Sequence, residues 1–258
     1  MRVVETKKRT PLAKRVSEAE WATRVDLAAC YRIAAHLRMT DLIYTHISAR
    51  VPGTDGHFLI NAYGLLFDEI TASNLVKVTH AGDIVDDTTG LGINPAGYVI
   101  HSAIHGARHD VGCVMHTHTG AGLAVAAQRQ GLLPLSQHAM RFAGCLAYHD
   151  YEGIALDMDE QQRLVRDLGS HNAMILRNHG LLTCGATVRT AFDLMYYLER
   201  ACQAQVAAMG GGAELTVPPP EVAAKVARQF TRPGRTAPGN AWAALRRLLD
   251  RQDPSYKT

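Results

Sequence analysis

Apolar residues recur with a helical spacing of three to four positions in some stretches of this chain and form short strand-like runs in others. The boundaries between these two kinds of stretch mark most of the predicted helices and strands. From residue 17 to residue 38 apolar residues recur every three or four positions in an alanine-rich stretch, which predicts an amphipathic helix. Ser17 and Glu20 have the spacing of a capping box at the start of this helix. Similar patterns predict helices at 97–108, 119–128, 159–169, 188–210 and 239–250.

Short apolar runs between these helices predict strands. The runs at 42–51 and 57–64 flank the turn sequence 52-PGTDG-56 and therefore predict a hairpin. Further strands are expected at 75–79, 111–118, 145–148 and 172–177, and the apolar stretch 181–185 follows the last of them. Because several strands are joined by hairpins, we predict an α/β fold with a mixed, mainly antiparallel sheet rather than a Rossmann sheet.

The same pattern predicts one main domain with an extension at each end. We expect residues 1–16 to form a flexible N-terminal arm, residues 17–210 the domain, and residues 211–258 a linker and a C-terminal helical tail. The tail helix has an apolar face with Trp242 as an anchor. We expect this face to cover a neighbouring subunit, and packing on its own chain is the alternative.

The composition is that of an ordinary globular protein. Hydrophobic residues make up 47% of the 258 residues and charged residues 20%, with a formal net charge of +3 that gives no reason to expect nucleic-acid binding. No apolar run approaches the roughly 18 residues of a membrane span, and no signal peptide is visible. The five cysteines contain no CxxC pair, which favours reduced thiols and a cytoplasmic protein.

Two histidines at the end of a predicted buried strand carry the strongest chemical signal. In 114-VMHTHTGAG-122, His116 and His118 are two positions apart and therefore point to the same face of the strand. His179 follows another apolar run and precedes Gly180, which permits a tight turn and a close approach of the backbone. We interpret the three imidazoles as one metal site. Separately hydrogen-bonded histidines are the alternative.

Three neutral nitrogen ligands with open coordination positions are typical of a divalent metal, most simply Zn²⁺, with Fe²⁺, Mn²⁺ or Co²⁺ as alternatives. An open position makes such an ion a Lewis acid that can polarise a carbonyl and stabilise an enolate. The site then predicts an enzyme that acts on a small molecule.

The chain resembles the class II aldolase/adducin family, closest to its adducin-like branch, over about residues 17–210. The stretches that carry the resemblance are 57-HFLINAYGLLFDEITASNLVKV-78, 93-INPAGYVIHSAIHGARHDVGCVMHTHT-119, 146-LAYHDYEG-153 and 175-ILRNHGLLTCG-185. The resemblance implies a three-layer α/β/α sandwich and a homotetramer with zinc sites at subunit boundaries. The family's three metal ligands fall on His116, His118 and His179.

The chain also departs from the family pattern where the aldolases carry catalytic and phosphate-binding groups. The position of the catalytic glutamate holds Gly97, and the two phosphate-binding serines fall on Pro95 and Ala96. The asparagine of the phosphate loop is replaced by His46, whereas Gly64 of a second turn is retained. These departures predict an unphosphorylated substrate and a different proton-transfer group.

Our candidates for that group are His138, His46 and the C-terminal Tyr256. The family's enzymes use a C-terminal tyrosine from a neighbouring subunit as a proton donor, and Tyr256 is the last tyrosine of this chain. Other polar residues of interest are His101, His105, Asp150 and Glu152.

We therefore predict a metal-dependent lyase that performs aldol cleavage or decarboxylation of a small, unphosphorylated keto or hydroxy acid or a related carbonyl compound. A metal-dependent oxygenase acting on a keto acid is one alternative. A non-catalytic adducin-like module for assembly is the other, and Gly97 favours it, whereas the three retained histidines oppose it.

Overall fold

The computed structural model describes residues 11–153, 158–232 and 239–258. The strands are β1 (His46–Arg50), β2 (His57–Ile60), β3 (Val76–Thr79), β4 (Ile84–Asp86), β5 (Cys113–Thr117), β6 (Ala147–His149), β7 (Ala173–Leu176) and β8 (Gly180–Gly185). The helices are α1 (Glu18–His36), α2 (Pro95–Ala107), α3 (Gly120–Ala126), α4 (Gln137–Met140), α5 (Met158–Leu168), α6 (Val188–Gly210), α7 (Pro220–Thr231) and α8 (Gly239–Gln252). Three short 3₁₀ turns complete the described elements: Leu12–Lys14, Phe67–Glu69 and Pro254–Lys257.

The strands form a single mixed sheet in the order β4-β3-β2-β1-β5-β8-β7-β6. All neighbouring strands are antiparallel except β6 and β7, which are parallel. The prediction of a mainly antiparallel sheet is therefore confirmed. Strand β5 lies in the middle of the sheet between β1 and β8. The residues that directly follow β5 therefore lie near the middle of the sheet, at the end where this strand terminates.

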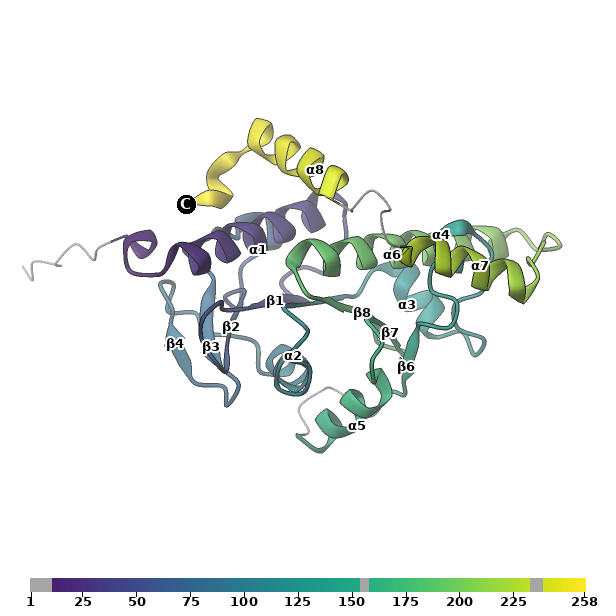
Figure 1. Ribbon diagram of the computed structural model, residues 1–258, viewed down its shortest axis with the longest axis horizontal. Coiled ribbons are helices and arrows are strands. Elements are labelled where there is room, and N and C mark those ends of the chain that lie inside the picture. Colours follow the sequence, from purple (N-terminus) through teal and green to yellow (C-terminus); the bar gives the residue numbers. More distant parts are fainter. Residues whose placement is uncertain (1–10, 154–157, 233–238) are drawn as a thin grey trace, which may run out of the picture.

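Helices cover both faces of the sheet, which confirms the three-layer α/β/α sandwich (Figure 1). Helices α1 and α6 lie on one face, with α8 outside α1, and helices α2 and α5 lie on the other. Because successive strand residues alternate between faces, Met115 packs into the core under α1 and α6, whereas Val114 packs into the core under α2 and α5. The central strands of the sheet are thus buried on both faces.

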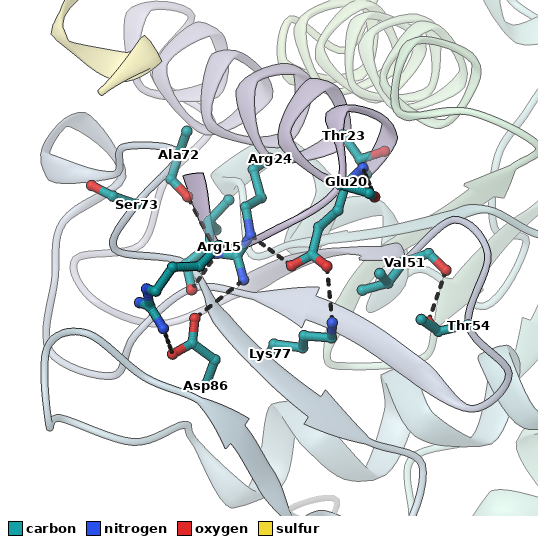
Figure 2. A network of polar contacts seen from close by, with 12 residues as sticks. Arg15, Glu20, Thr23, Arg24, Val51, Thr54, Ala72, Ser73, Lys77 and Asp86 are labelled. Carbon is teal, nitrogen blue, oxygen red and sulfur yellow. Dashed lines mark hydrogen bonds and ion pairs between the residues drawn. The ribbon is translucent and has the colours of Figure 1, made fainter. Parts of the chain in front are cut away.

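Helix α1 begins where the sequence predicts, at Ser17, whose side chain accepts a hydrogen bond from the backbone N–H of Glu20. The Glu20 carboxylate does not complete the capping box, because it binds Arg24 at 3.0 Å and Lys77 at 2.9 Å (Figure 2). Arg24 is fully buried and also donates to the carbonyl oxygens of Ala72 and Leu75. This network ties α1 to strand β3 and to the turn that precedes it.

Among the described strands and α-helices, one strand and two helices were not predicted from the sequence. Strand β4 is an edge strand of only three residues, Ile84, Val85 and Asp86, which is too short to show a strand pattern. Helix α4 has four residues, too few to show a period. Helix α7 begins at Pro220, inside the stretch we interpreted as a linker, because proline is well tolerated in the first helical turn.

The C-terminal tail packs on its own chain. Trp242 of α8 lies against Phe192 of α6 with ring centroids 5.6 Å apart, and Arg246 forms an ion pair with Asp26 of α1 at 2.6 Å. At the other end of the chain, Leu12 is buried and Arg15 forms an ion pair with Asp86, while residues 1–10 of the predicted arm lie outside the described residues. Contacts of the tail with a neighbouring subunit stay a prediction. None of the helices described has the length and apolarity that a membrane crossing requires.

Candidate metal centre

The antiparallel pairing of β5 and β8 brings His179 to the histidine pair. His116 is the fourth residue of β5, and His118 follows the strand directly. Strand β8 begins at Gly180, and Thr117 of β5 is paired with Leu181 of β8, so the β7–β8 turn lies beside the end of β5. A Cβ atom on Gly180 would stand 2.4 Å from the Thr117 carbonyl oxygen, which explains why a glycine is needed here.

The three imidazoles converge. One ring nitrogen from each of His116, His118 and His179 can be chosen so that all three atoms lie within 4.8 Å of one another. The ring centroids of His116 and His179 are 4.8 Å apart, and those of His118 and His179 are 5.0 Å apart. The predicted convergence of these rings is thus what the structure shows, and their spacing is suited to a shared ion.

The outer nitrogens of two rings are held by acceptors. Nδ1 of His116 lies 2.9 Å from the carbonyl oxygen of Leu181, and Nδ1 of His118 lies 3.1 Å from the carboxylate of Asp41. Both Nδ1 atoms therefore carry a proton, and in the neutral rings both Nε2 atoms are bare. These two Nε2 atoms face each other at 2.9 Å, where their lone pairs repel unless a cation lies between them. The residues present therefore fit a metal ion, and the fixed Nδ1–H groups orient the rings for it.

Burial keeps the imidazoles of His116 and His179 neutral. It lowers the pKa of His116 well below its usual value, and the neighbouring His179 and His118 add to this effect. Burial, followed by the proximity of His118, lowers the pKa of His179 to about 4. Metal ligands must be deprotonated, so both rings are ready to bind at neutral pH without releasing a proton.

The histidines lie in the wall of a cavity of about 340 Å³. Its other lining residues are aromatic, polar or small: Tyr44, Thr45, His46, Tyr63, Asn94, Gly97, Ile100, Tyr151 and Gly153. Tyr151 lies with its ring centroid 6.3 Å from that of His179. Among the described residues no lysine or arginine lines this cavity. A small, largely uncharged molecule fits such a wall better than a phosphate ester does.

His46 and Gly97 share one space in this wall. His46 pairs with His116 across the β1–β5 ladder and is 5% exposed. A Cβ atom on Gly97 would lie 2.4 Å from Nδ1 of His46. The imidazole of His46 therefore fills the volume into which a side chain at position 97 would project.

The matching family model, the Class II Aldolase and Adducin N-terminal domain, covers residues 25–206. The chain belongs to the class II aldolase and adducin family. It is 54% identical over 246 residues to a provisionally named class 2 aldolase protein of Pseudomonas aeruginosa, a match that covers 94% of both chains. It is also 48% identical over 191 residues to alpha-adducin of Rattus norvegicus, covering 73% of this chain and 26% of that protein.

Solved structures agree with this family membership. An aldolase II superfamily protein from Pseudomonas syringae has a TM-score of 0.92 and 59% identity, covering 96% of this chain and all of that one. An L-fuculose 1-phosphate aldolase from Glaciozyma antarctica has a TM-score of 0.81 and 26% identity, covering 99% and 97%. The class II aldolase fold is therefore shown along almost the whole chain.

Two of the three proton-transfer candidates lie away from the cavity of their own chain. His138, on α4, packs its ring against Tyr197 of α6, with centroids 5.1 Å apart. Tyr256 is buried in the C-terminal 3₁₀ turn and donates to Asp250 at 2.7 Å. Only His46 lines the cavity. The roles of His138 and Tyr256 stay predictions that require a second subunit.

The remaining candidates have separate places. His101 and His105 of α2 lie behind the cavity wall, where both bind the hydroxyl of Ser48. Glu152 forms an ion pair with Arg163 of α5 at 2.5 Å. Asp150 does not line the cavity and belongs, next to Tyr151, to a separate surface depression.

Sequence reasoning missed Asp41 and the cavity tyrosines. Asp41 belongs to the loop before β1, in which Leu42 and Thr45 have positive φ angles of 47° and 68°. We had included residues 42–45 in a strand, because they are apolar or β-branched. Asp41 carries no local motif, so only its position beside His118 reveals it.

Proposed function

We propose that this protein is a metal-dependent lyase that cleaves a carbon–carbon bond in a small, unphosphorylated 2-keto or 2-hydroxy acid or a related carbonyl compound. The observation that carries the proposal is the pair of bare Nε2 atoms of His116 and His118 facing each other at 2.9 Å, with His179 beside them in a cavity wall. A structural protein has no need for three imidazoles converging on one cavity.

The proposed ligands are His116, His118 and His179, and the proposed ion is Zn²⁺, with Fe²⁺, Mn²⁺ and Co²⁺ as the alternatives. Such an ion supplies Lewis acidity, which stabilises the negative charge that develops on a carbonyl oxygen during carbon–carbon cleavage. The chain's own contribution is to fix the rings through Leu181 and Asp41.

We infer that the substrate carries no phosphate from the side chains at positions 94–97 and from the residues that line the cavity. Proline, alanine and glycine at positions 95, 96 and 97 offer no side-chain hydroxyl to a phosphate. Asn94 and the phenols of Tyr44, Tyr63 and Tyr151 are neutral and suit hydroxyl, carbonyl or single carboxylate groups. The aldolase from Glaciozyma antarctica is named for a phosphorylated sugar, so we propose a different substrate for this chain.

We assign the first proton transfer to His46. It is neutral, because burial lowers its pKa to about 3, with a smaller effect from His118. Neither ring nitrogen has a hydrogen-bond partner among the described residues. A substrate hydroxyl donates its proton to His46 while the carbon–carbon bond breaks, and the electron pair of that bond passes to the enolate. A cavity phenol such as Tyr151 then protonates the enolate carbon, and the proton held by His46 passes back to the phenolate, which restores both groups.

Members of this family are typically homo-oligomers that act on small molecules. We propose a tetramer in which a neighbouring subunit brings His138 or Tyr256 to the cavity. Molar mass from light scattering tests the tetramer. His138→Ala and Tyr256→Phe test the contribution of the neighbour, because each would lower turnover without lowering metal content.

The alternative is an adducin-like assembly module without catalysis. Gly97 favours it, because the position of the family glutamate has no functional group. The 48% identity to alpha-adducin over three quarters of the chain also favours it. The module has no requirement for a bound metal or for metal-dependent ligand binding, so these two measurements separate the hypotheses.

The experiment combines metal analysis with ligand binding on the full chain. We expect about one equivalent of metal per chain after incubation with Zn²⁺ and dialysis, and loss of that metal in His116→Ala and His179→Ala. His109→Ala, at an exposed histidine in the turn after α2, is the matched control and keeps the metal. Calorimetry with pyruvate and related 2-keto acids then tests binding that depends on the metal. A wild-type protein that retains no metal contradicts the lyase.

A further inference from the structure

We propose that the substrate of this site carries an aromatic ring, and that Tyr44, Tyr63 and Tyr151 form the subsite that binds it. The substrate is then a 2-keto or 2-hydroxy acid with an aryl side chain rather than a three-carbon acid. The acid end of this substrate rests on the proposed function, whereas the tyrosine subsite depends only on the size and the composition of the cavity.

The cavity is larger than a three-carbon acid requires. Its volume is about 340 Å³. Pyruvate has six non-hydrogen atoms, and if each takes no more than the roughly 30 Å³ of a water molecule, the acid fills at most about 180 Å³. Much of the cavity therefore stays empty beside pyruvate, and an unfilled space forfeits dispersion contacts. Phenylpyruvate, with about twice as many non-hydrogen atoms, uses the whole space.

Three tyrosines from separate segments line this cavity with exposed rings. Tyr44 precedes β1, Tyr63 follows β2, and Tyr151 follows β6. Their exposed fractions are 45%, 38% and 53%, so each ring keeps a large unpacked surface. Within the described part of the chain, their one ring contact is that of Tyr151 with His179. The three rings are therefore available to a ligand.

The distribution of charge separates the two ends of the substrate. Among the described residues that line the cavity there is no lysine, arginine, aspartate or glutamate. A carboxylate that leaves water needs a compensating charge, and the three convergent histidines are the place where a divalent ion supplies it. The rest of the molecule then faces the tyrosines and the buried side chain of Ile100, so it is uncharged and apolar.

An aryl ring fits this wall better than a chain with many hydroxyl groups. Such a chain requires carboxylate and amide partners, and Asn94 is the one carboxamide among the described lining residues. Tyrosine rings favour another ring, stacked with an offset or edge to face, at centroid distances of about 4.5–7 Å. The ring of Tyr151 lies 6.3 Å from that of His179, so the tyrosine subsite begins directly beside the histidines.

The test compares the binding of pyruvate and phenylpyruvate by calorimetry, on the full chain loaded with Zn²⁺. We expect phenylpyruvate to bind at least about tenfold more tightly, because its ring leaves water for the tyrosine subsite. Tyr44→Leu and Tyr63→Leu keep an apolar side chain without the ring. Each should weaken the binding of phenylpyruvate by about 2- to 10-fold and leave that of pyruvate unchanged. Tyr196→Leu is the matched control, because this ring packs against Phe192 and Tyr197 of α6 and does not line the cavity.

Equal affinities for pyruvate and phenylpyruvate overturn the inference and leave the lyase in place. A neighbouring subunit that fills the mouth of the cavity would give this result. An affinity for 4-methyl-2-oxopentanoate as high as that for phenylpyruvate also overturns it, because burial of a branched alkyl group would then suffice. The same holds if both tyrosine variants bind phenylpyruvate as tightly as the wild type does.

A second probe keeps the tyrosine subsite separate from the proposed function. If no keto acid binds, the lyase is contradicted, and 4-methylphenol, which has a ring but no acid group, decides the subsite alone. Saturation-transfer nuclear magnetic resonance without added metal should detect 4-methylphenol on the wild type and not on the double variant Tyr44→Leu with Tyr63→Leu. No transfer to the wild type, or equal transfer to both proteins, overturns the subsite.

Discussion

His46 stands where a side chain on Gly97 would have to be, with Nδ1 only 2.4 Å from the position of a Cβ atom on that glycine. The two residues come from different elements, β1 and α2, which are 51 positions apart in the chain. In the family pattern position 97 is a glutamate. The imidazole of His46 and a glutamate side chain at position 97 would therefore occupy the same space. A larger residue at position 97 requires a smaller or displaced side chain at position 46.

We predict a strong coupling between these two positions. Gly97→Ala forces the buried ring of His46 to move, which typically costs about 1–3 kcal/mol of unfolding free energy for overpacking. In a His46→Ala background the same substitution meets no ring, and the cost disappears. Urea unfolding of the two single variants and the double variant measures the coupling as a double-mutant cycle.

The control for this cycle lies on the same helix. Gly106 is exposed, and nothing lies within 4 Å of a Cβ atom built on it. Gly106→Ala should therefore stabilise α2 by about 0.5–1 kcal/mol, because alanine is the better helix former. A Gly97→Ala variant as stable as the wild type would show that the ring of His46 does not occupy this space.

Asp41 should strengthen metal binding without touching the metal. Its carboxylate holds Nδ1–H of His118 at 3.1 Å and thereby fixes the orientation of the ring. We expect Asp41→Ala to weaken Zn²⁺ binding by about 10- to 100-fold, the usual effect of losing such a partner. Competition with a chromogenic chelator measures the affinity, and Asp55→Ala, in the exposed β1–β2 turn, should leave it unchanged.

The convergence of the three histidines could be predicted from the sequence, because their signal is local. His116 and His118 are two positions apart at a strand end, and His179 precedes a glycine at another strand end, so strand periodicity alone places three rings at one edge. The central sheet was predictable for the same reason. Alternating and continuous apolar runs at β1, β2, β3, β5 and β7 identified the buried strands.

Other features depend on tertiary contacts and leave no pattern in the sequence. Asp41 acts only because the loop before β1 turns with positive φ angles at Leu42 and Thr45. The partnership of Ser48 with two histidines of α2 depends on how that helix crosses the sheet. From the sequence, Gly97 and His46 were two unrelated departures from the family pattern. Only the structure shows that the ring of His46 fills the space next to Gly97.

The metal-free protein should lose stability on mild acidification. Burial lowers the pKa of His46 and that of His105 to about 3, whereas an unfolded histidine titrates near 6.5. Between these values the unfolded state binds more protons than the folded state, so the stability present above pH 6.5 decreases as the pH falls. Each such ring contributes up to about 1.4 kcal/mol per pH unit. Urea midpoints between pH 7 and pH 5 measure this decrease.

A double variant isolates the contribution of the two rings. His46→Ala with His105→Phe removes both depressed groups, so its urea midpoint should depend less steeply on pH than that of the wild type. His109→Ala, at an exposed histidine, should leave the slope unchanged. Equal slopes for the wild type and the double variant would show that these rings do not titrate with depressed pKa values.

Arg24 should be the most costly polar side chain to remove from the α1 face of the fold (Figure 2). It is fully buried, and it binds Glu20 and the carbonyl oxygens of Ala72 and Leu75. Arg24→Met keeps most of the aliphatic volume but leaves the Glu20 carboxylate with Lys77 alone. Breaking a buried ion pair in this way typically costs about 3–5 kcal/mol, because the remaining charge is left poorly compensated.

The effect should separate buried from exposed arginines. Arg166, whose side chain is 70% exposed, pairs with Asp167, so Arg166→Met should change the unfolding free energy by less than about 1 kcal/mol. Replacing Glu20 as well, in Arg24→Met with Glu20→Gln, removes the uncompensated charge and should recover part of the loss. If the double variant is no more stable than Arg24→Met, the cost comes from the carbonyl groups of Ala72 and Leu75 and not from the carboxylate, because both variants leave these carbonyls without the Arg24 donor.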